Sequence, residues 1–238
     1  MNTGETSTAI GIQRHGHVAV VEMRRPPHNF FDLAMLTQMA DAFEALAADV
    51  QCRAIVLAAE GKSFCAGADF NRPGEGEKRV PARQLYQQAV RLFAAPKPVV
   101  AAVQGPAIGG GLGVALVADF RVSCAEARFS ANFARLGFHP GFGLSHTLPR
   151  LIGAQQASLL LLTGRRIGGE EAQRIGLVDL LVPQAEVRAE AMKLAGEIAA
   201  GAPIAVQATR ASLRAGLPEA VREATEREAA LQAEHFEM

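Results

Sequence analysis

Two glycine-bearing segments, each a few residues after a short apolar run, most constrain the fold of this chain. Residues 64–69 read Phe-Cys-Ala-Gly-Ala-Asp and come after the run 54–59; residues 109–113 read Gly-Gly-Gly-Leu-Gly and come after the run 99–103. Small residues after a strand let the backbone turn sharply and let another group approach its N–H atoms. The second segment opens an apolar helical stretch, so it also offers the unpaired N–H donors of a helix N-terminus. Two such segments brought together predict a pocket for an oxyanion.

The order of apolar and helical patterns along the chain predicts an α/β fold. Apolar runs on either side of His15-Gly16 predict a hairpin, and Asp32 is placed to cap the helix that follows. Because strands and helices then alternate, we expect a mostly parallel sheet, with a helical region after Val182. The strands are expected at 10–14, 18–23, 54–59, 99–103 and 120–124, and the helices at 33–48, 81–95, 185–200, 203–215 and 218–235.

Composition excludes several classes of protein. The chain has 238 residues, 49% of them apolar and 20% charged, which predicts a large core and argues against disorder. Its net charge is zero, so no broad basic field attracts nucleic acid or an anionic membrane. The stretch 98–118 is uncharged and long enough to span a membrane, but its prolines and glycine cluster favour a buried strand, turn and helix. We therefore expect neither a nucleic-acid nor a membrane partner.

Residues 1–8 are polar and contain no signal peptide, and we expect them to be disordered. The three cysteines, Cys52, Cys65 and Cys124, show neither metal-ligand spacing nor a disulfide framework. Reduced thiols and a cytoplasmic location follow as the simpler expectation, with no metal site. Cys65 lies in the first glycine segment and is a candidate nucleophile, but a small residue that fills space beside the loop is the favoured alternative.

These segments resemble those of the crotonase family, also called the enoyl-CoA hydratase/isomerase superfamily. Further matching motifs, in the family's order, are Arg25-Pro26 before Asn29, Asp119-Phe120-Arg121, Thr163-Gly164-Arg165, Glu171-Ala172 and Gly176-Leu177-Val178. The resemblance implies an α/β spiral of ββα units over residues 9–182, followed by a helical region, 183–238, that packs homotrimers, often paired into hexamers. It also implies an acyl-CoA thioester substrate, with coenzyme A as part of the substrate and no separate cofactor.

The resemblance also implies roles for single residues. Ala68 and Gly110 match the positions whose backbone N–H groups form the family's oxyanion hole, where they would stabilise the thioester oxygen of an enolate. The residues at substrate-contacting positions are Asn29 and Phe31 near the adenine, Ala66, Asp69, Phe70 and Asn71 along the pantetheine, and Gly109, Gly113 and Phe133 in the pocket. For Asp69, a structural carboxylate that accepts N–H bonds within the loop is an equal alternative.

The chain departs from the family at the positions where family members have their acid–base residues. Gly113 and Phe133 stand where the family's hydratases have two glutamates, and Gly141 stands at the aspartate of the dehalogenase branch. Glycine and phenylalanine can neither aim a water nor protonate a carbon, so we expect slow hydration. Three functions stay open: an enolate-forming enzyme with another proton carrier, a silent acyl-CoA-binding homologue, and a CoA-thioester hydrolase or decarboxylase.

Residues 132–146 occupy the stretch where the family places its second acid. His139 could transfer a proton near neutral pH, although a histidine satisfied by loop backbone is the favoured reading. Tyr86, the only tyrosine, belongs to a helix that borders the acyl pocket in this family, and packing is its more ordinary role. From volume alone, Phe133 should lower the polarity of the pocket, and Gly113 should open space for a bulky acyl group.

The last helices are expected to assemble the oligomer. Val187, Ala191, Leu194 and Ile198 form an apolar stripe at helical spacing that we expect to be buried between subunits. Family members usually continue past a helix such as 218–235, so the chain is either a short natural form or a truncated one.

Overall fold

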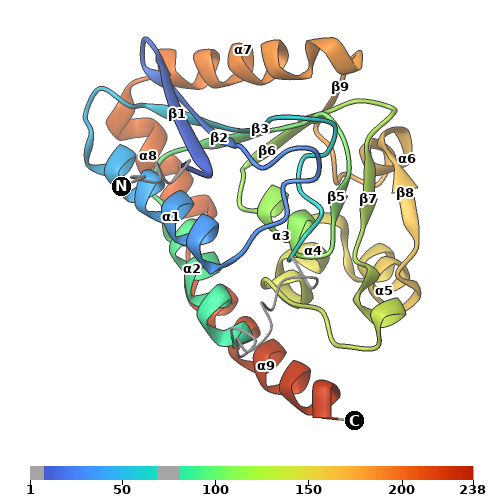
Figure 1. The fold of residues 1–238 in the computed structure, drawn as a ribbon. Coiled ribbons are helices and arrows are strands. Elements are labelled where there is room, and N and C mark those ends of the chain that lie inside the picture. Colours follow the sequence, from blue (N-terminus) through green and yellow to red (C-terminus); the bar gives the residue numbers. More distant parts are fainter. Residues whose placement is uncertain (1–7, 69–80, 238) are drawn as a thin grey trace, which may run out of the picture.

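The computed structural model describes residues 8–68 and 81–237, and within them a twisted sheet carries helices on both faces (Figure 1). In this sheet β1 pairs antiparallel with β2, and the following strands run parallel in the order β2-β3-β4-β6-β9. The strands are β1 (Ile10–His15), β2 (Val18–Met23), β3 (Ala54–Ala59), β4 (Val99–Val103), β6 (Phe120–Ser123) and β9 (Leu180–Leu181). The predicted α/β fold with a hairpin and a mostly parallel sheet is confirmed.

A smaller sheet stands beside the large one and has the order β5-β7-β8 (Figure 1). Its strands are β5 (Ala107–Ile108), β7 (Arg128–Ser130) and β8 (Arg166–Gly168), and the short helices near it are α4 (Leu144–Ile152), α5 (Ala154–Thr163) and α6 (Gly169–Arg174). Because β5 connects β4 to the next helix, the second glycine segment lies at the junction of the two sheets.

The longer helices form two layers around the large sheet (Figure 1). Helix α7 packs on β2, β3, β4 and β6, whereas α1 and α2 pack on each other on the opposite side, and α9 runs along α2. These helices are α1 (Leu33–Ala48), α2 (Ala82–Ala94), α7 (Val187–Ala200), α8 (Pro203–Leu213) and α9 (Leu217–Glu237). The short helix α3 (Gly110–Leu116) begins in the second glycine segment. As the sequence predicts, Asp32 caps α1, since its side chain accepts a hydrogen bond from the Met35 N–H at 2.8 Å.

Helix α7 corrects the expectation for the apolar stripe of the C-terminal region. Val187 and Ala191 are fully buried within this single chain, and Leu194 and Ile198 are partly buried against the same core. The stripe covers the chain's own sheet because β3 and β4 are apolar on both faces and need a helix on each. Helix α8 instead exposes apolar side chains, with Ile204 at 86% and Leu213 at 71%. The trimer or hexamer stays a prediction.

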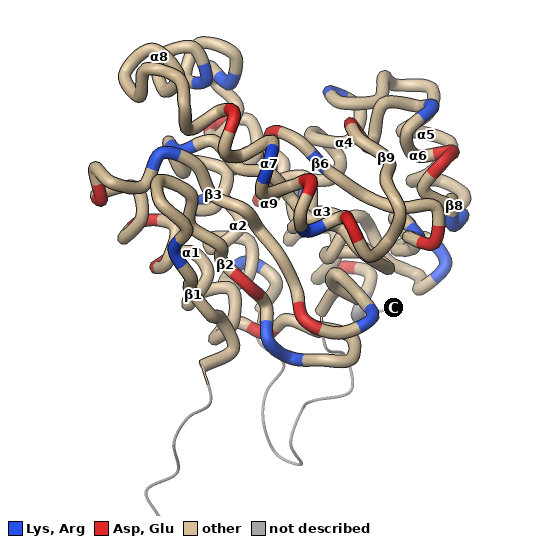
Figure 2. Tube along the Cα trace, turned by 90° about the horizontal axis from the view of Figure 1, so that it is seen from above, with Lys and Arg blue, Asp and Glu red and all other residues tan. Residues whose placement is uncertain are grey.

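Charged residues of both signs are interspersed along the trace, as the zero net charge suggests (Figure 2). None of the helices between residues 8 and 68 or between 81 and 237 is both long and apolar enough to cross a membrane. The expected disorder at 1–8 falls almost wholly outside the described residues, and so do Asp69, Phe70 and Asn71.

Candidate active site

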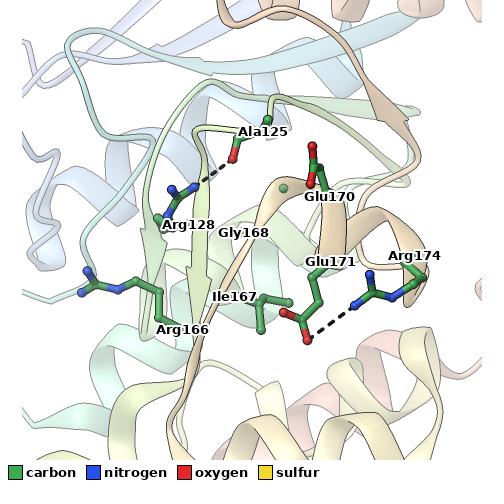
Figure 3. A pocket seen from close by; sticks show the side chains of 9 residues that line it. Ala125, Arg128, Arg166, Ile167, Gly168, Glu170, Glu171 and Arg174 are labelled. Atoms are coloured by element: carbon green, nitrogen blue, oxygen red, sulfur yellow. Dashed lines mark hydrogen bonds and ion pairs between the residues drawn. The ribbon is translucent and has the colours of Figure 1, made fainter.

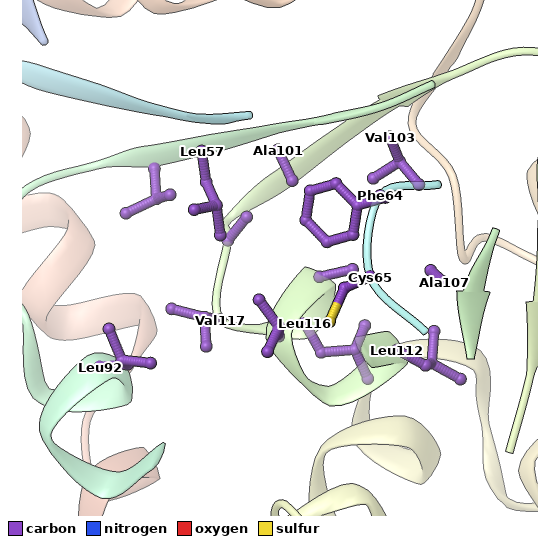
Figure 4. Close-up of a cluster of buried hydrophobic side chains, with 14 of the residues drawn as sticks. Leu57, Phe64, Cys65, Leu92, Ala101, Val103, Ala107, Leu112, Leu116 and Val117 are labelled. Atoms are coloured by element: carbon purple, nitrogen blue, oxygen red, sulfur yellow. The ribbon is translucent and has the colours of Figure 1, made fainter. Parts of the chain in front are cut away.

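The first glycine segment is anchored by two buried residues. Phe64 and Cys65 are fully buried between β4 and α3 (Figure 4), and Cys65 pairs with Ala107 of β5 in a parallel bridge. The Cys65 N–H donates to the Pro106 carbonyl and the Ile108 N–H donates to the Cys65 carbonyl, both at 3.0 Å. The Cys65 thiol donates to the Asn29 carbonyl at 3.2 Å, and burial raises its pKa to about 12, which favours packing over a nucleophilic role.

The two glycine segments abut each other. A Cβ atom built on Gly111 would lie 2.0 Å from the Cys65 carbonyl oxygen, so only glycine allows this approach. A Cβ on Gly67, whose φ is +94°, would lie 2.9 Å from the Ile108 carbonyl oxygen and 3.5 Å from the Gly110 amide nitrogen. The backbone on either side of Gly67 therefore rests against the first turn of α3.

Two backbone N–H groups at this junction have no partner within the described chain. Ala68 forms a parallel bridge with Phe31, in which the Phe31 N–H donates to the Gly67 carbonyl, so the Ala68 N–H points away from that neighbour. Gly110 is the first residue of α3, and its N–H is one of the unpaired donors of a helix start. Among the described residues, neither N–H donates to a backbone carbonyl. Both are available to an external oxygen.

Aromatic side chains surround the start of α3. A Cβ atom built on Gly110 would lie 2.6 Å from the Phe31 ring. A Cβ atom built on Gly109 would lie 3.8 Å from the Phe133 ring. Phe31 and Phe142 contact each other with ring centroids 5.7 Å apart, and both are buried. The nearest polar side-chain atom to Gly109 is Asn132 Oδ1, 3.2 Å from the built Cβ. The surroundings are therefore apolar, as Phe133 predicts, with one amide at the edge.

The expectation that Gly113 opens space is wrong. A Cβ on Gly113 would lie 2.7 Å from both Cβ and Cδ1 of Phe142, which fills the room. Phe142 is fully buried and has a φ of +62°, an unfavourable value for a bulky residue that costs about 1–3 kcal/mol. Sequence reasoning missed Phe142 because nothing in a local pattern predicts a phenylalanine in the left-handed region.

The family model described as enoyl-CoA hydratase/isomerase matches residues 13–238. The chain belongs to the enoyl-CoA hydratase/isomerase family. It is 35% identical to the short-chain-enoyl-CoA hydratase of Clostridium acetobutylicum over 214 residues, which cover 87% of this chain and 81% of that protein. It is also 35% identical to the carnitinyl-CoA dehydratase of Escherichia coli K12 over 209 residues, which cover 86% of this chain and 79% of that protein.

A solved structure supports the same assignment. The enoyl-CoA hydratase/isomerase of Pseudoalteromonas atlantica T6c superimposes with a TM-score of 0.87 and 31% identity, covering 96% of this chain and 91% of that one. The crotonase resemblance and the crotonase fold are thus confirmed. Relatives of this similarity support an acyl-CoA enzyme of the hydratase/isomerase type.

In this member of the enoyl-CoA hydratase/isomerase family, Asn29 has an internal role. It is fully buried with a φ of +51°, and its side-chain N–H groups donate to the carbonyls of Glu60 at 2.7 Å and Ser63 at 2.9 Å. Its Oδ1 accepts the Arg25 N–H at 2.9 Å. These bonds order the backbone leading to Ala66, which is partly buried and whose N–H donates to the His28 carbonyl.

His139 lies in the turn before α4, where its ring contacts loop backbone and its own backbone is held by side chains of α9. Its ring Nδ1 is 2.8 Å from the Pro140 carbonyl, which requires a proton on Nδ1 and leaves Nε2 as the free acceptor of a neutral ring. Its own N–H donates to His235 Nδ1, and its carbonyl accepts from Gln232 on α9. Tyr86 is buried beside this turn and donates its hydroxyl to Gln232 Oε1 at 2.7 Å, which confirms a packing position.

Sequence reasoning also missed Glu228, a fully buried carboxylate on α9. The signal was present, because Glu228 falls in register with the buried face of that helix. Between residues 217 and 235 of α9, the buried residues are Leu217, Val221, Ala224, Thr225, Glu228 and Gln232.

A separate hollow lies between β8 and α6, away from the glycine segments (Figure 3). Its walls carry charges of both signs, with Arg128 and Arg166 on one side and the Glu171–Arg174 pair on the other. None of the residues around Ala68 and Gly110 lines it.

Proposed function

We propose that this protein binds an acyl-CoA thioester and stabilises its enolate through the N–H groups of Ala68 and Gly110. The observation that carries this proposal is the contact between the two glycine segments. It brings the Ala68 and Gly110 N–H groups close together, and neither donates to a backbone carbonyl of the described residues. An enolate oxygen gains charge in the transition state, and each preorganised donor of this kind is typically worth about 3 kcal/mol.

Proton transfer in this proposal does not use the two usual glutamates. Gly113 is packed against Phe142, and Phe133 presents a ring beside Gly109. Neither position can aim a water at an enoyl carbon, so isomerisation or another enolate reaction fits better than hydration. His139 is the candidate proton carrier, because the Pro140 carbonyl fixes the tautomer that leaves Nε2 basic.

The aromatic surroundings favour decarboxylation as a second candidate. Loss of carbon dioxide from a carboxylated acyl-CoA breaks the bond between the α-carbon and the carboxylate and leaves the electron pair in the thioester enolate. That step needs the two N–H donors but no activated water, which suits a site bordered by the apolar rings of Phe31, Phe133 and Phe142. A proton taken from solvent then adds to the α-carbon of the enolate and completes the reaction.

A panel of thioesters tests the proposal. Crotonyl-CoA reports hydration, a 3-enoyl-CoA reports isomerisation, and methylmalonyl-CoA reports decarboxylation. Exchange of the α-protons of butyryl-CoA in D₂O reports the enolate directly, and we expect exchange with very slow hydration. Hydration at an ordinary rate, on the order of 10 s⁻¹, would contradict the assignment of Gly113 and Phe133. Binding without exchange or turnover would identify a silent homologue, and release of free CoA would identify a hydrolase.

A further inference from the structure

A buried carboxylate ties the last helix to the turn that carries Phe142. Glu228 Oε2 accepts a hydrogen bond from the Gly143 N–H at 2.7 Å. Its Oε1 accepts two more, from the Ser145 N–H at 3.0 Å and from the Ser145 hydroxyl at 2.6 Å. Bonds to an ionised acceptor are roughly twice as strong as neutral ones. Glu228 therefore fixes the first turn of α4 from a distant part of the sequence.

The turn requires such support. Phe142 and Gly143 are consecutive left-handed residues, with φ values of +62° and +75°. A phenylalanine adopts this conformation only where its surroundings hold it. The conformation places the Phe142 ring against Gly113 and Phe31, at the start of α3. The group that accepts the Gly143 N–H bond therefore also fixes the position of the Phe142 ring.

We infer that Glu228 is a positioning residue for the acyl pocket, which holds the Phe142 ring against Gly113 and Phe31 through the turn at Gly143. The inference rests on the proposed function, since Gly113 and Phe31 adjoin the proposed enolate site. Glu228 acts only through Phe142 and contacts no reacting atom.

Protonation of Glu228 changes the bonds that hold the turn. A carboxylate accepts all three donors, whereas a neutral carboxyl carries its own proton, and the Ser145 hydroxyl must then accept instead of donate. Burial raises the pKa of Glu228 to about 7, although its bonds with Ser145 and Gly143 act in the opposite direction. Near neutral pH the hydrogen bonds between Glu228 and the turn therefore strengthen as pH rises, while burial of the new charge lowers the free energy of unfolding of the whole fold.

Charged and titratable groups reach this region from each neighbouring helix. On α9, Arg227 favours the ionised form of Glu228 and so lowers its pKa. Helix α4 contributes His146, whose own pKa is lowered by burial and by Arg150. Helix α2 contributes Tyr86, whose pKa burial raises, with Glu228 acting in the same direction. A pH profile is therefore informative only as a difference between matched variants.

The test compares wild type, E228Q and E226Q by calorimetric titration with butyryl-CoA between pH 5.5 and 8.5. Glu226 is exposed on the same helix and serves as the control. We expect wild type and E226Q to bind about tenfold more tightly at pH 8.5 than at pH 5.5. E228Q resembles the neutral carboxyl, so it should bind weakly at every pH. The phosphates of CoA titrate equally with all three proteins, so their effect cancels in the comparison.

Tyr86 provides a second readout that needs no ligand. It is the only tyrosine in a chain without tryptophan, and a Cβ built on Gly141 would lie 1.8 Å from its hydroxyl oxygen. Its fluorescence should change with a midpoint near pH 7 in wild type and stay constant in E228Q. If E228Q fails to fold, wild type is compared with Ser145→Ala, which removes a donor that lowers the pKa of Glu228 and should raise the midpoint. An equal midpoint in both, or constant emission of wild type between pH 5.5 and 8.5, overturns the inference.

The two proposals fail in different ways. Binding by wild type with the same pH profile in E228Q overturns the role of Glu228 and leaves the proposed function standing. Absence of butyryl-CoA binding at every pH overturns the proposed function together with the pocket role of Glu228.

Discussion

Phe142 occupies the space that the first side-chain atom at Gly113 would need. Its Cβ and Cδ1 lie 2.7 Å from a Cβ built there, well inside van der Waals contact. The position that the family resemblance matches to a hydratase glutamate is thus closed here by a ring from another segment. A side chain at residue 113 and the Phe142 ring would exclude each other, since they need the same space.

The stability effects of substitutions at Gly113 and at Phe142 should not be additive. Gly113→Ala adds the crowding atom, and overpacking of this kind should lower the free energy of unfolding by about 1–3 kcal/mol. With Phe142→Gly already in place, the same substitution should cost much less, because the ring is gone. Urea denaturation of the two single variants and the double variant gives the coupling. Additive losses would show that Phe142 does not exclude side chains at Gly113.

Hydratase activity should return only when the ring is removed. Glutamates at both Gly113 and Phe133 supply the missing proton carriers, each worth about 10²- to 10⁴-fold in rate. We expect the variant with both glutamates to hydrate crotonyl-CoA no faster than wild type, and the same variant with Phe142→Gly to hydrate it faster. The decrease in enoyl absorbance with time measures the hydration rate of each variant. A faster rate with Phe142 intact would contradict the proposed exclusion.

The Gly110 N–H can be tested with two variants that both place a Cβ against Phe31. Gly110→Ala and Gly110→Pro both add a Cβ 2.6 Å from the Phe31 ring, but only proline removes the N–H. Proline is well tolerated at the first position of a helix, so α3 should persist. We expect α-proton exchange of butyryl-CoA to be about 10²- to 10³-fold slower in Gly110→Pro than in Gly110→Ala. Equal exchange rates would remove Gly110 from the proposed oxyanion hole.

The sequence predicted the elements that have continuous apolar runs or clear caps. The strands Ala54–Ala59 and Val99–Val103 and the Asp32 cap lie where they were expected. Strands of two or three residues, such as β5 and β9, were missed because they are too short for a periodic signal.

Contacts between segments explain the misses in the candidate site. The Phe142 ring reaches Gly113 from the turn before α4, and Glu228 reaches that turn from α9. Neither relationship is encoded by local spacing. The stripe at Val187 and Ala191 was assigned to a subunit interface because spacing shows which face of a helix is apolar but not what covers it.

Glu228 should make the stability of the fold depend on pH. Its carboxyl keeps its proton up to about pH 7 in the native state, whereas an ordinary glutamate loses it near 4.5. The native state then binds more protons between these values, so the free energy of unfolding falls as pH rises from 4.5 to 7 and is constant above. The contribution is on the order of 3 kcal/mol.

Urea denaturation of wild type, E228Q and the E226Q control at pH 5 and pH 8 measures this effect. E228Q lacks the titrating group, so its stability relative to wild type should increase from pH 5 to pH 8, whereas E226Q should follow wild type. A difference between wild type and E228Q that is the same at both pH values would show that Glu228 does not titrate in this range.

An oligomer should form through the exposed face of α8. We expect a cyclic trimer or a dimer of trimers by light scattering at micromolar concentration. Ile204→Asp should lower the mass, because Ile204 is 86% exposed in the single chain. Leu162→Asp is the control, since Leu162 is 78% exposed on α5, beside the smaller sheet (Figure 1). A monomeric wild type, or an equal effect of both substitutions, would contradict this assembly.

The bond between Gly143 and Glu228 spans 85 residues, and this separation has a consequence for synthesis of the protein. A ribosome adds about 5–20 residues per second, so roughly 4–17 s pass between the appearance of the turn and that of its partner. During that interval the nascent chain holds both glycine segments but lacks the carboxylate that fixes Phe142. The pocket wall is thus among the last parts of the molecule to become ordered, and a chain stalled before Glu228 should lack it.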